Sequence, residues 1–214
     1  MRQTAAVAVL LLALPAALAA ADDDVGLGLP APAFTLKTLN PDTAGVPSVS
    51  LEQYVGAEPE DPGAKVVLLS FFASWCGPCQ KEMPFLVQLD RMYREQGLRV
   101  VSVSIDQEPA AIEKARQQVH AAGAAYPVLS DRFNFVARRY LGEKAPLPSV
   151  FLVSRDGNVR RIERGYAKDA PSFLLADVQA HLGLKPARAT AAADTAPSRT
   201  PAATPASGPA QKSK

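Results

Sequence analysis

Cysteine and histidine are scarce in this chain of 214 residues, which holds two of each. A structural zinc site takes four ligands, and the sequence offers no such cluster near its cysteines, so zinc binding is not indicated. Neither sign of charge dominates: 23 basic and 21 acidic residues leave a formal charge of +2, which indicates no nucleic-acid or polyanion partner. A content of 48% hydrophobic and 21% charged residues argues against a wholly disordered or fibrous chain. A chain of this length can bury one sizeable core, and one domain is the natural count.

The N-terminus has the pattern of a targeting segment. One early cation, Arg2, precedes an apolar block over Ala5–Leu14 and a run of small residues that ends before three aspartates. This pattern predicts a cleavable secretory signal over residues 1–21, cut before either Ala20 or Asp22. An uncleaved membrane anchor is the alternative, although the apolar block is short for a spanning helix of about 20 residues. We therefore expect an exported protein, periplasmic or extracytoplasmic, without a membrane span after cleavage.

Composition also sets the expected limits of the folded part. Residues 22–29 are acidic and then rich in glycine and proline, which predicts a flexible lead-in to a domain over residues 30–184. From Lys185 onward the chain has no valine, isoleucine, leucine or aromatic residue, while alanine, proline, threonine and serine dominate. Such a segment has almost nothing to bury, so residues 185–214 are predicted to be a disordered tail.

Between these limits, strand and helix patterns alternate. The predicted strands are Phe34–Leu39, Val49–Leu51, Val66–Phe72, Leu98–Ile105, Tyr126–Leu129, Pro148–Val153 and Asn158–Arg164. The predicted helices are Pro78–Gln96, bent by Pro84 and stopped at Gly97, then Pro109–His120, Asp131–Tyr140 with Asp131 at or near its N-cap, and Pro171–Leu182.

Two parts of this pattern predict how strands pair. The continuous apolar run Val66–Phe72 is typical of a central strand covered on both faces. The order strand, helix, strand that follows it predicts a parallel pair joined by a crossover. Asp156-Gly157 lies between the last two predicted strands and is a strong signal for a hairpin turn.

Both cysteines lie where the central strand gives way to the first long helix, in the string Trp75-Cys76-Gly77-Pro78-Cys79. The first turn of a helix offers unpaired N–H groups and the positive end of the helix dipole, which favour a thiolate. A purely structural disulfide is a weak alternative, because so short a loop constrains the unfolded chain little. We therefore expect a reactive dithiol.

Three motifs in order resemble the thioredoxin superfamily, and specifically its exported TlpA/ResA-like branch. They are the WCGPC string, Pro84 five residues after Cys79, and Leu147-Pro148-Ser149, which resembles the cis-proline segment. The resemblance covers roughly residues 30–183. It implies an α/β thioredoxin-like fold, a mixed central sheet with helices on both faces. One extra strand-helix unit, around residues 126–140, precedes the cis-proline, as in the TlpA/ResA-like branch.

The resemblance also implies roles for individual residues. Cys76 would be the exposed nucleophile that forms a mixed disulfide with a substrate, and Cys79 would resolve it, leaving a Cys76–Cys79 disulfide. The substrate-binding residues implied are Trp75, Gly77, Pro78, Leu147 and Pro148. For Trp75 the alternative is simple packing. The Gly77-Pro78 dipeptide resembles that of thioredoxin and implies a reductant.

Glu82 is the candidate proton acceptor. It lies three residues past Cys79 on the same predicted helix, where TlpA/ResA-like reductases are similar in carrying an acidic residue. Thioredoxin has a buried aspartate six residues before its first cysteine, but Ser70 occupies that position here. If Glu82 is partly buried, its pKa is expected to be raised. A solvated helix charge is the alternative.

These observations favour an exported thiol-disulfide oxidoreductase that reduces disulfide-containing exported proteins. We expect no cofactor, and we expect a membrane protein to supply the electrons. Cytochrome c maturation is one possible pathway. Three alternatives stay open. An oxidant or isomerase would differ in redox poise. A Cu(I) chaperone would use the two thiolates, with Met83 the nearest further ligand. A peroxidase would share the fold, but is expected to carry a lone cysteine in a loop rich in proline and threonine.

Overall fold

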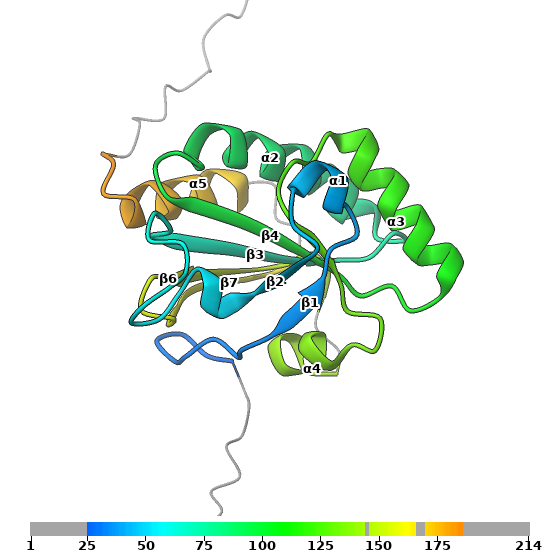
Figure 1. The fold of residues 1–214 in the computed structure, drawn as a ribbon, viewed down its shortest axis with the longest axis horizontal. Coiled ribbons are helices and arrows are strands. Elements are labelled where there is room, and N and C mark those ends of the chain that lie inside the picture. Colours follow the sequence, from blue (N-terminus) through cyan, green and yellow to red (C-terminus); the bar gives the residue numbers. More distant parts are fainter. Residues whose placement is uncertain (1–24, 144–145, 166–169, 186–214) are drawn as a thin grey trace, which may run out of the picture.

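The computed structural model describes residues 25–143, 146–165 and 170–185. The predicted signal over residues 1–21 and nearly all of the predicted tail lie outside these residues. Among the helices within them, none is long and apolar enough to cross a membrane. The domain between these two ends is drawn in colour in Figure 1.

A central sheet of five strands has the order β5-β4-β3-β6-β7. Its strands are β3 (Val66–Phe72), β4 (Leu98–Ser104), β5 (Val128–Ser130), β6 (Ser149–Ser154) and β7 (Val159–Arg164). β4 pairs in parallel with both β3 and β5, while β6 is antiparallel to β3 and to β7. The predicted mixed sheet, parallel crossover and C-terminal hairpin are confirmed.

Helices cover both faces of this sheet (Figure 1). One face packs against α2 (Gly77–Tyr93), α3 (Pro109–Ala122) and α5 (Ala170–His181). The other packs against α4 (Phe135–Leu141) and a separate antiparallel pair, β1 (Thr35–Lys37) and β2 (Ser48–Ser50), followed by the 3₁₀ helix η1 (Leu51–Gln53). The thioredoxin-like fold is confirmed, including the extra unit, which is β5 and α4.

β3 lies in the middle of the sheet, and all seven of its residues are buried. Its side chains alternate between the two cores, as a period of two requires. Leu68 and Phe72 belong to the core beneath α2, whereas Leu69 and Phe71 belong to the core beneath α4. Ser70 therefore faces α2, the helix that carries both cysteines.

Several predicted boundaries differ from the structure; α2, for example, ends at Tyr93 rather than at Gln96. Two further differences involve residues before a helix. A short helix, α1 (Pro41–Ala44), was not predicted; the buried Asn40 before it donates to Ala124 O and Tyr126 O and accepts from Val128 N. α4 begins at Phe135 rather than at Asp131. The reason is that Asn134 takes a left-handed conformation, with φ 56°, and forms the N-cap.

The chain ends of the domain follow from the strand directions. β7 finishes at the same edge of the sheet as β3, and α5 then runs back, so that the orange C-terminal end of the described chain lies at the opposite edge (Figure 1).

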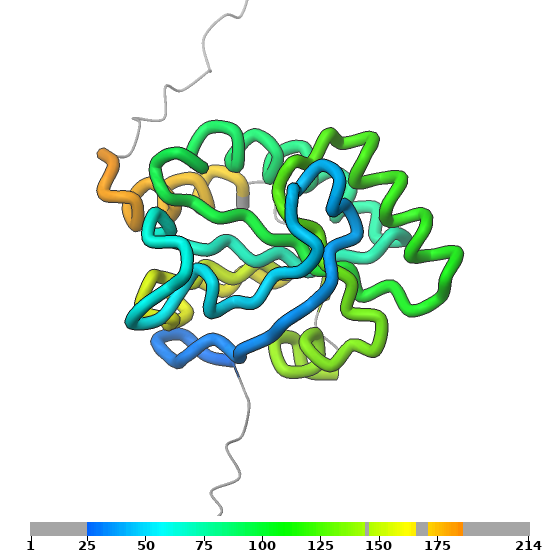
Figure 2. The backbone as a smooth tube through the Cα atoms, in the orientation of Figure 1, coloured from blue at the N-terminus to red at the C-terminus, as the bar shows by residue number. Residues whose placement is uncertain are grey.

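At the other end of the chain, Gly28 N donates to Val159 O at 2.8 Å and Val159 N donates to Leu29 O at 2.9 Å. The blue segment in Figure 2 is thus joined to β7, and ordered contacts begin before residue 30.

Candidate active site

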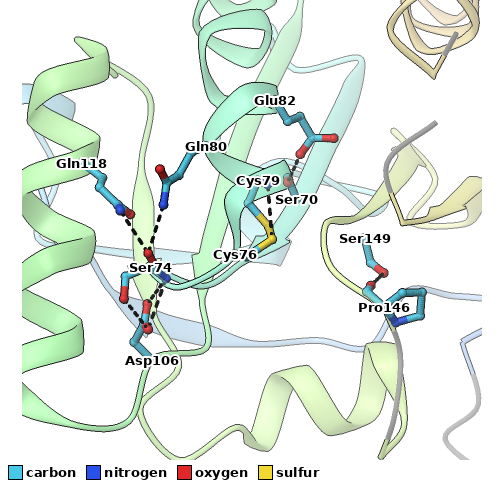
Figure 3. The surroundings of a disulfide bond; sticks show 10 residues. All are labelled: Ser70, Ser74, Cys76, Cys79, Gln80, Glu82, Asp106, Gln118, Pro146 and Ser149. Carbon is cyan, nitrogen blue, oxygen red and sulfur yellow. Dashed lines mark hydrogen bonds between the residues drawn. A yellow bond between two sulfur atoms is a disulfide. The ribbon is translucent and has the colours of Figure 1, made fainter. Parts of the chain in front are cut away.

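The turn between β3 and α2 holds the two cysteines. Cys76 N donates to Ala73 O at 3.0 Å, and Cys76 is the N-cap of α2. Cys76 and Cys79 form a disulfide, and Cys79 N donates to Cys76 Sγ at 3.2 Å (Figure 3). Pro78 in the first turn removes no hydrogen bond, because N–H groups there have no partner within the helix. Cys76 Sγ therefore lies at the positive end of the α2 dipole, which stabilises a thiolate once the bond is reduced.

The oxidised pair is less accessible than expected. Cys76 is 5% exposed and Cys79 2%, and both belong to the core beneath α2. The prediction of an exposed Cys76 is therefore not met in this disulfide form, because the Cys76 sulfur is bonded against the first turn of the helix. Trp75 next to it is 67% exposed, so its indole is not packed into the core.

Glu82 and Ser70 come together from α2 and β3. Ser70 Oγ donates to Glu82 Oε2 at 3.0 Å (Figure 3). Burial raises the pKa of Glu82 to about 7, while the hydrogen bond from Ser70 opposes the rise. Glu82 is half-buried, so the alternative of a fully solvated helix charge is wrong. Its role as the proton acceptor of Cys79 stays a prediction.

The peptide bond between Leu147 and Pro148 is cis, as the resemblance implied. Pro148 is buried, and Leu147 packs against the core that contains both cysteines. Two hydrogen bonds hold this loop: Ser149 Oγ donates to Pro146 O at 2.6 Å, and Gly165 N donates to Pro148 O at 2.7 Å. Figure 3 places this loop among the surroundings of the disulfide. That Leu147 and Pro148 bind substrate remains a prediction, as it does for Trp75, Gly77 and Pro78.

A buried carboxylate holds the cysteine turn, and sequence reasoning missed it. Asp106, which is 2% exposed, accepts hydrogen bonds from Ser74 N at 2.9 Å, Ser74 Oγ at 2.9 Å and Ser104 Oγ at 2.8 Å. The Ser74 carbonyl in turn accepts from Gln80 Nε2 and Gln118 Nε2 (Figure 3). The sequence did contain a signal for Asp106, because Asp106 directly follows β4 as the cysteines follow β3. Since β3 and β4 are parallel neighbours, the residues that follow them lie at the same edge of the sheet.

Metal ligands do not gather in the described part of the chain, where no group of three histidine, cysteine or acidic side chains lies close enough to hold an ion. Met83, the candidate third ligand of a Cu(I) site, is 5% exposed and packs in the core beneath α2. The arrangement around the two sulfurs suits thiol-disulfide exchange.

Comparison with known proteins agrees with this chemistry. The model of the AhpC/TSA family matches residues 27–162. The chain is 30% identical over 156 residues to the thiol-disulfide oxidoreductase ResA of Geobacillus kaustophilus (strain HTA426), covering 72% of this chain and 83% of that protein.

Solved structures show the same similarity. One is a Chlorobium tepidum protein assigned as the thiol:disulfide interchange protein DsbE, with a TM-score of 0.62 and 29% identity, covering 75% of this chain and 100% of that one. Another, from Bacteroides thetaiotaomicron, is assigned as a protein disulfide isomerase, with a TM-score of 0.62 and 27% identity, covering 74% of this chain and 91% of that one. All three names describe reactions of disulfide bonds.

Proposed function

The chain belongs to the AhpC/TSA family and is a thiol-disulfide oxidoreductase of thioredoxin-like fold, and we propose that it is an exported reductant of disulfides in extracytoplasmic partner proteins. The observation that carries the proposal is the Cys76–Cys79 disulfide at the N-terminus of α2. It is the oxidised form of the redox pair, in which a reductant ends each cycle.

The reaction proceeds in two exchanges. The Cys76 thiolate attacks one sulfur of the partner disulfide, forms a mixed disulfide and releases the other partner sulfur as a thiolate. The Cys79 thiolate then attacks Cys76 Sγ, which restores the bond seen in the structure and releases the second partner thiolate. The partner gains two electrons and the protein loses two. The Cys76–Cys79 disulfide itself places the two sulfurs within reach of each other.

Glu82 supports the second exchange. Cys79 must lose its proton before it attacks, and a free cysteine has a pKa near 8.5. A carboxylate whose pKa burial raises to about 7 accepts a proton more readily at neutral pH than an ordinary glutamate does. Glu82 lies one helical turn beyond Cys79 on α2, and Ser70 orients its carboxylate. We therefore assign Glu82 as the group that accepts the proton of the Cys79 thiol.

Gly77 and Pro78 favour reduction of the partner over its oxidation. Their similarity to the dipeptide of thioredoxin favours a potential close to thioredoxin's, about −270 mV, over that of DsbA, about −120 mV. A reductant outside the cytoplasm must be reduced again after each cycle, so we include a membrane protein as electron donor. Cytochrome c maturation is a process that fits, because haem attachment at C-x-x-C-H needs reduced cysteines. Export rests on the signal pattern of residues 1–21.

The test is the reduction potential of the Cys76–Cys79 pair, measured by equilibration against glutathione and dithiothreitol buffers. A value close to that of thioredoxin supports the reductant. A value close to that of DsbA overturns it and makes the protein an oxidant or isomerase. The Cys76→Ser variant, which cannot form the pair, gives the baseline of the measurement.

A further inference from the structure

Three aromatic side chains are left in solvent on segments that follow parallel strands. Trp75 is 67% exposed, Phe133 64% and Phe135 66%. Trp75 follows β3, whereas Phe133 and Phe135 follow β5. Because β3, β4 and β5 run in parallel, these loops leave the sheet at one edge, the edge that carries the disulfide. Exposed aromatic groups at one end of a sheet are typical of an interaction surface.

Hydrogen bonds join these loops to one another through β4. Ile105 N, after β4, donates to Phe72 O at 3.0 Å, and Asp131 N donates to Ser104 O at 2.9 Å. With its amide nitrogen turned toward these carbonyls, Asn134 donates to Ile105 O at 3.1 Å and to Asp131 O at 2.9 Å. The segment that carries the two phenylalanines is therefore fixed beside the loop that adjoins the dithiol.

The segment is also ordered from within. The buried Asp131 carboxylate accepts hydrogen bonds from Phe135 N at 3.1 Å and Ala137 N at 2.7 Å. The rings of Phe133 and Phe135 lie 5.9 Å apart between centroids. A partner that docks here meets aromatic groups whose backbone is already in place, which lowers the entropic cost of binding.

A hollow of about 510 Å³ lies between α4 and the loop after β4. Its lining includes Ile105, Asn134, Ala137, Arg138, Leu141 and Glu143. In Figure 3 the ribbon of α4 lies below the turn that holds the disulfide. The hollow is large enough for side chains of an extended polypeptide.

The charge of this surface is positive. Residues 131–143 contain three arginines and two acids, a net charge of +1. The carboxylate of Asp131 is buried and bonded to the start of α4, whereas Glu143 is exposed and lines the hollow beside Arg138. The Arg132 guanidinium carbon lies 5.8 Å from the centroid of the Phe133 ring, and Arg138 lines the hollow. Both arginines are exposed.

We propose that Trp75, Phe133, Phe135, Arg132 and Arg138 form a docking surface for an extended, acidic stretch of polypeptide that flanks the reactive cysteine of a partner. The inference rests on the proposed function, because the docked stretch belongs to the protein whose disulfide is exchanged. The extra unit, β5 with α4, thus recognises partners in addition to extending the sheet. Acidic side chains pair with the arginines, and apolar ones pack on the aromatic rings.

A binding experiment tests this without any redox step. Two labelled peptides have the same apolar residues, and in both a serine replaces the cysteine. One peptide has aspartates in the flanking positions, and the other has lysines there. Affinity for the oxidised protein is measured by fluorescence anisotropy. Emission of Trp75, the single tryptophan of the chain, reports whether binding occurs at the surface. We expect the acidic peptide to bind at least about tenfold more tightly and to shift the Trp75 emission to shorter wavelength.

Variants with matched controls locate the site. Phe133→Ser with Phe135→Ser, and Arg132→Glu with Arg138→Glu, should each weaken binding of the acidic peptide at least about tenfold. Met92→Ser and Lys114→Glu change an exposed apolar and an exposed basic residue elsewhere and should leave it unchanged. All the side chains changed are exposed, and thermal unfolding checks that each variant folds.

Several outcomes overturn the inference while leaving the reduction potential, and with it the proposed function, untouched. They are equal affinity for the two peptides, no binding of either, or equal loss in the control variants. Binding of the protein to anionic lipid vesicles but not to the peptides would assign the surface to a membrane. A dimer in sedimentation that Phe133→Ser with Phe135→Ser abolishes would assign it to a second copy of the chain.

Discussion

Ser70 Oγ donates a hydrogen bond of 3.0 Å to Glu82 Oε2, which joins the central strand to the helix that carries both cysteines. The bond favours the ionised carboxylate, whereas burial favours the protonated one, and burial is the larger effect. The pKa of Glu82 therefore reaches about 7, between that of a solvated glutamate and that of a thiol. This is the range in which a carboxyl group both takes up and releases a proton near neutral pH.

Glu82→Gln should slow disulfide reduction at pH 7 by about tenfold to a hundredfold, because general-base assistance to Cys79 is lost. In the wild type the single-turnover rate should rise with pH through an inflection near 7, and the variant should lack it. Ser70→Ala is the matched control: it keeps the carboxylate but removes the bond that lowers its pKa, so the inflection should move to higher pH. Identical pH profiles in all three proteins would remove Glu82 from the mechanism.

The same group should make stability depend on pH. Folding raises the pKa of Glu82 from 4.5 to about 7, so the folded state binds its proton more tightly than the unfolded state does. The resulting stabilisation is fully present below pH 4.5 and is lost as the pH rises through 7. Relative to Glu82→Gln, the wild type should lose up to about 3 kcal/mol of unfolding free energy between pH 4.5 and 8. Urea unfolding of the oxidised proteins at both pH values measures it, and a constant difference would contradict it.

Asp106→Ala should lower the free energy of unfolding by about 2–4 kcal/mol, since it leaves buried donors of Ser74 and Ser104 without an acceptor. It should also slow the reaction with a small disulfide such as oxidised glutathione, because the turn before Cys76 loses its anchor. Asp106→Asn keeps an acceptor oxygen and should recover much of both properties.

Asp131→Ala is the control for this position, because Asp131 is an equally buried carboxylate that holds α4 instead of the cysteine turn. It should lower stability but not the rate with the small disulfide. If Asp106→Ala affects stability alone, Asp106 has no positioning role.

Gly97→Ala should destabilise the protein by at least about 2 kcal/mol. Gly97 has a φ of 112°, and an added Cβ would lie 2.8 Å from both Gly63 O and Lys65 Cγ. Gly45→Ala is the control, since its φ is 73° with nothing within 4 Å of the added carbon, and it should cost only about 1 kcal/mol. Thermal or urea unfolding compares the two, and equal costs would mean that the contact at Gly97 relaxes.

The features that could be predicted from the sequence are those set by local pattern. The apolar run Val66–Phe72 predicted the central strand, and Asp156-Gly157 predicted the hairpin. The cis bond at Leu147-Pro148 was implied by the resemblance to the thioredoxin superfamily. The start of α4 could not be predicted, because Asp131 bonds to the helix N–H groups across the left-handed Asn134.

Site features that depend on tertiary register were also beyond the sequence. Ser70 and Glu82 were each identified as positions of interest, but their hydrogen bond requires α2 to lie over one particular face of β3. The contact of Asp106 with Ser74 likewise depends on the pairing of β4 with β3, which brings residues 32 apart in the chain together.

The direction of α5 has a practical consequence for handling the protein. Because this helix returns to the edge of the sheet opposite the disulfide, anything joined after it starts away from the redox pair (Figure 1). A surface linker, a fused fluorescent reporter or an electrode coating attached at that end therefore leaves the edge that holds Cys76 and Cys79 open to an incoming protein.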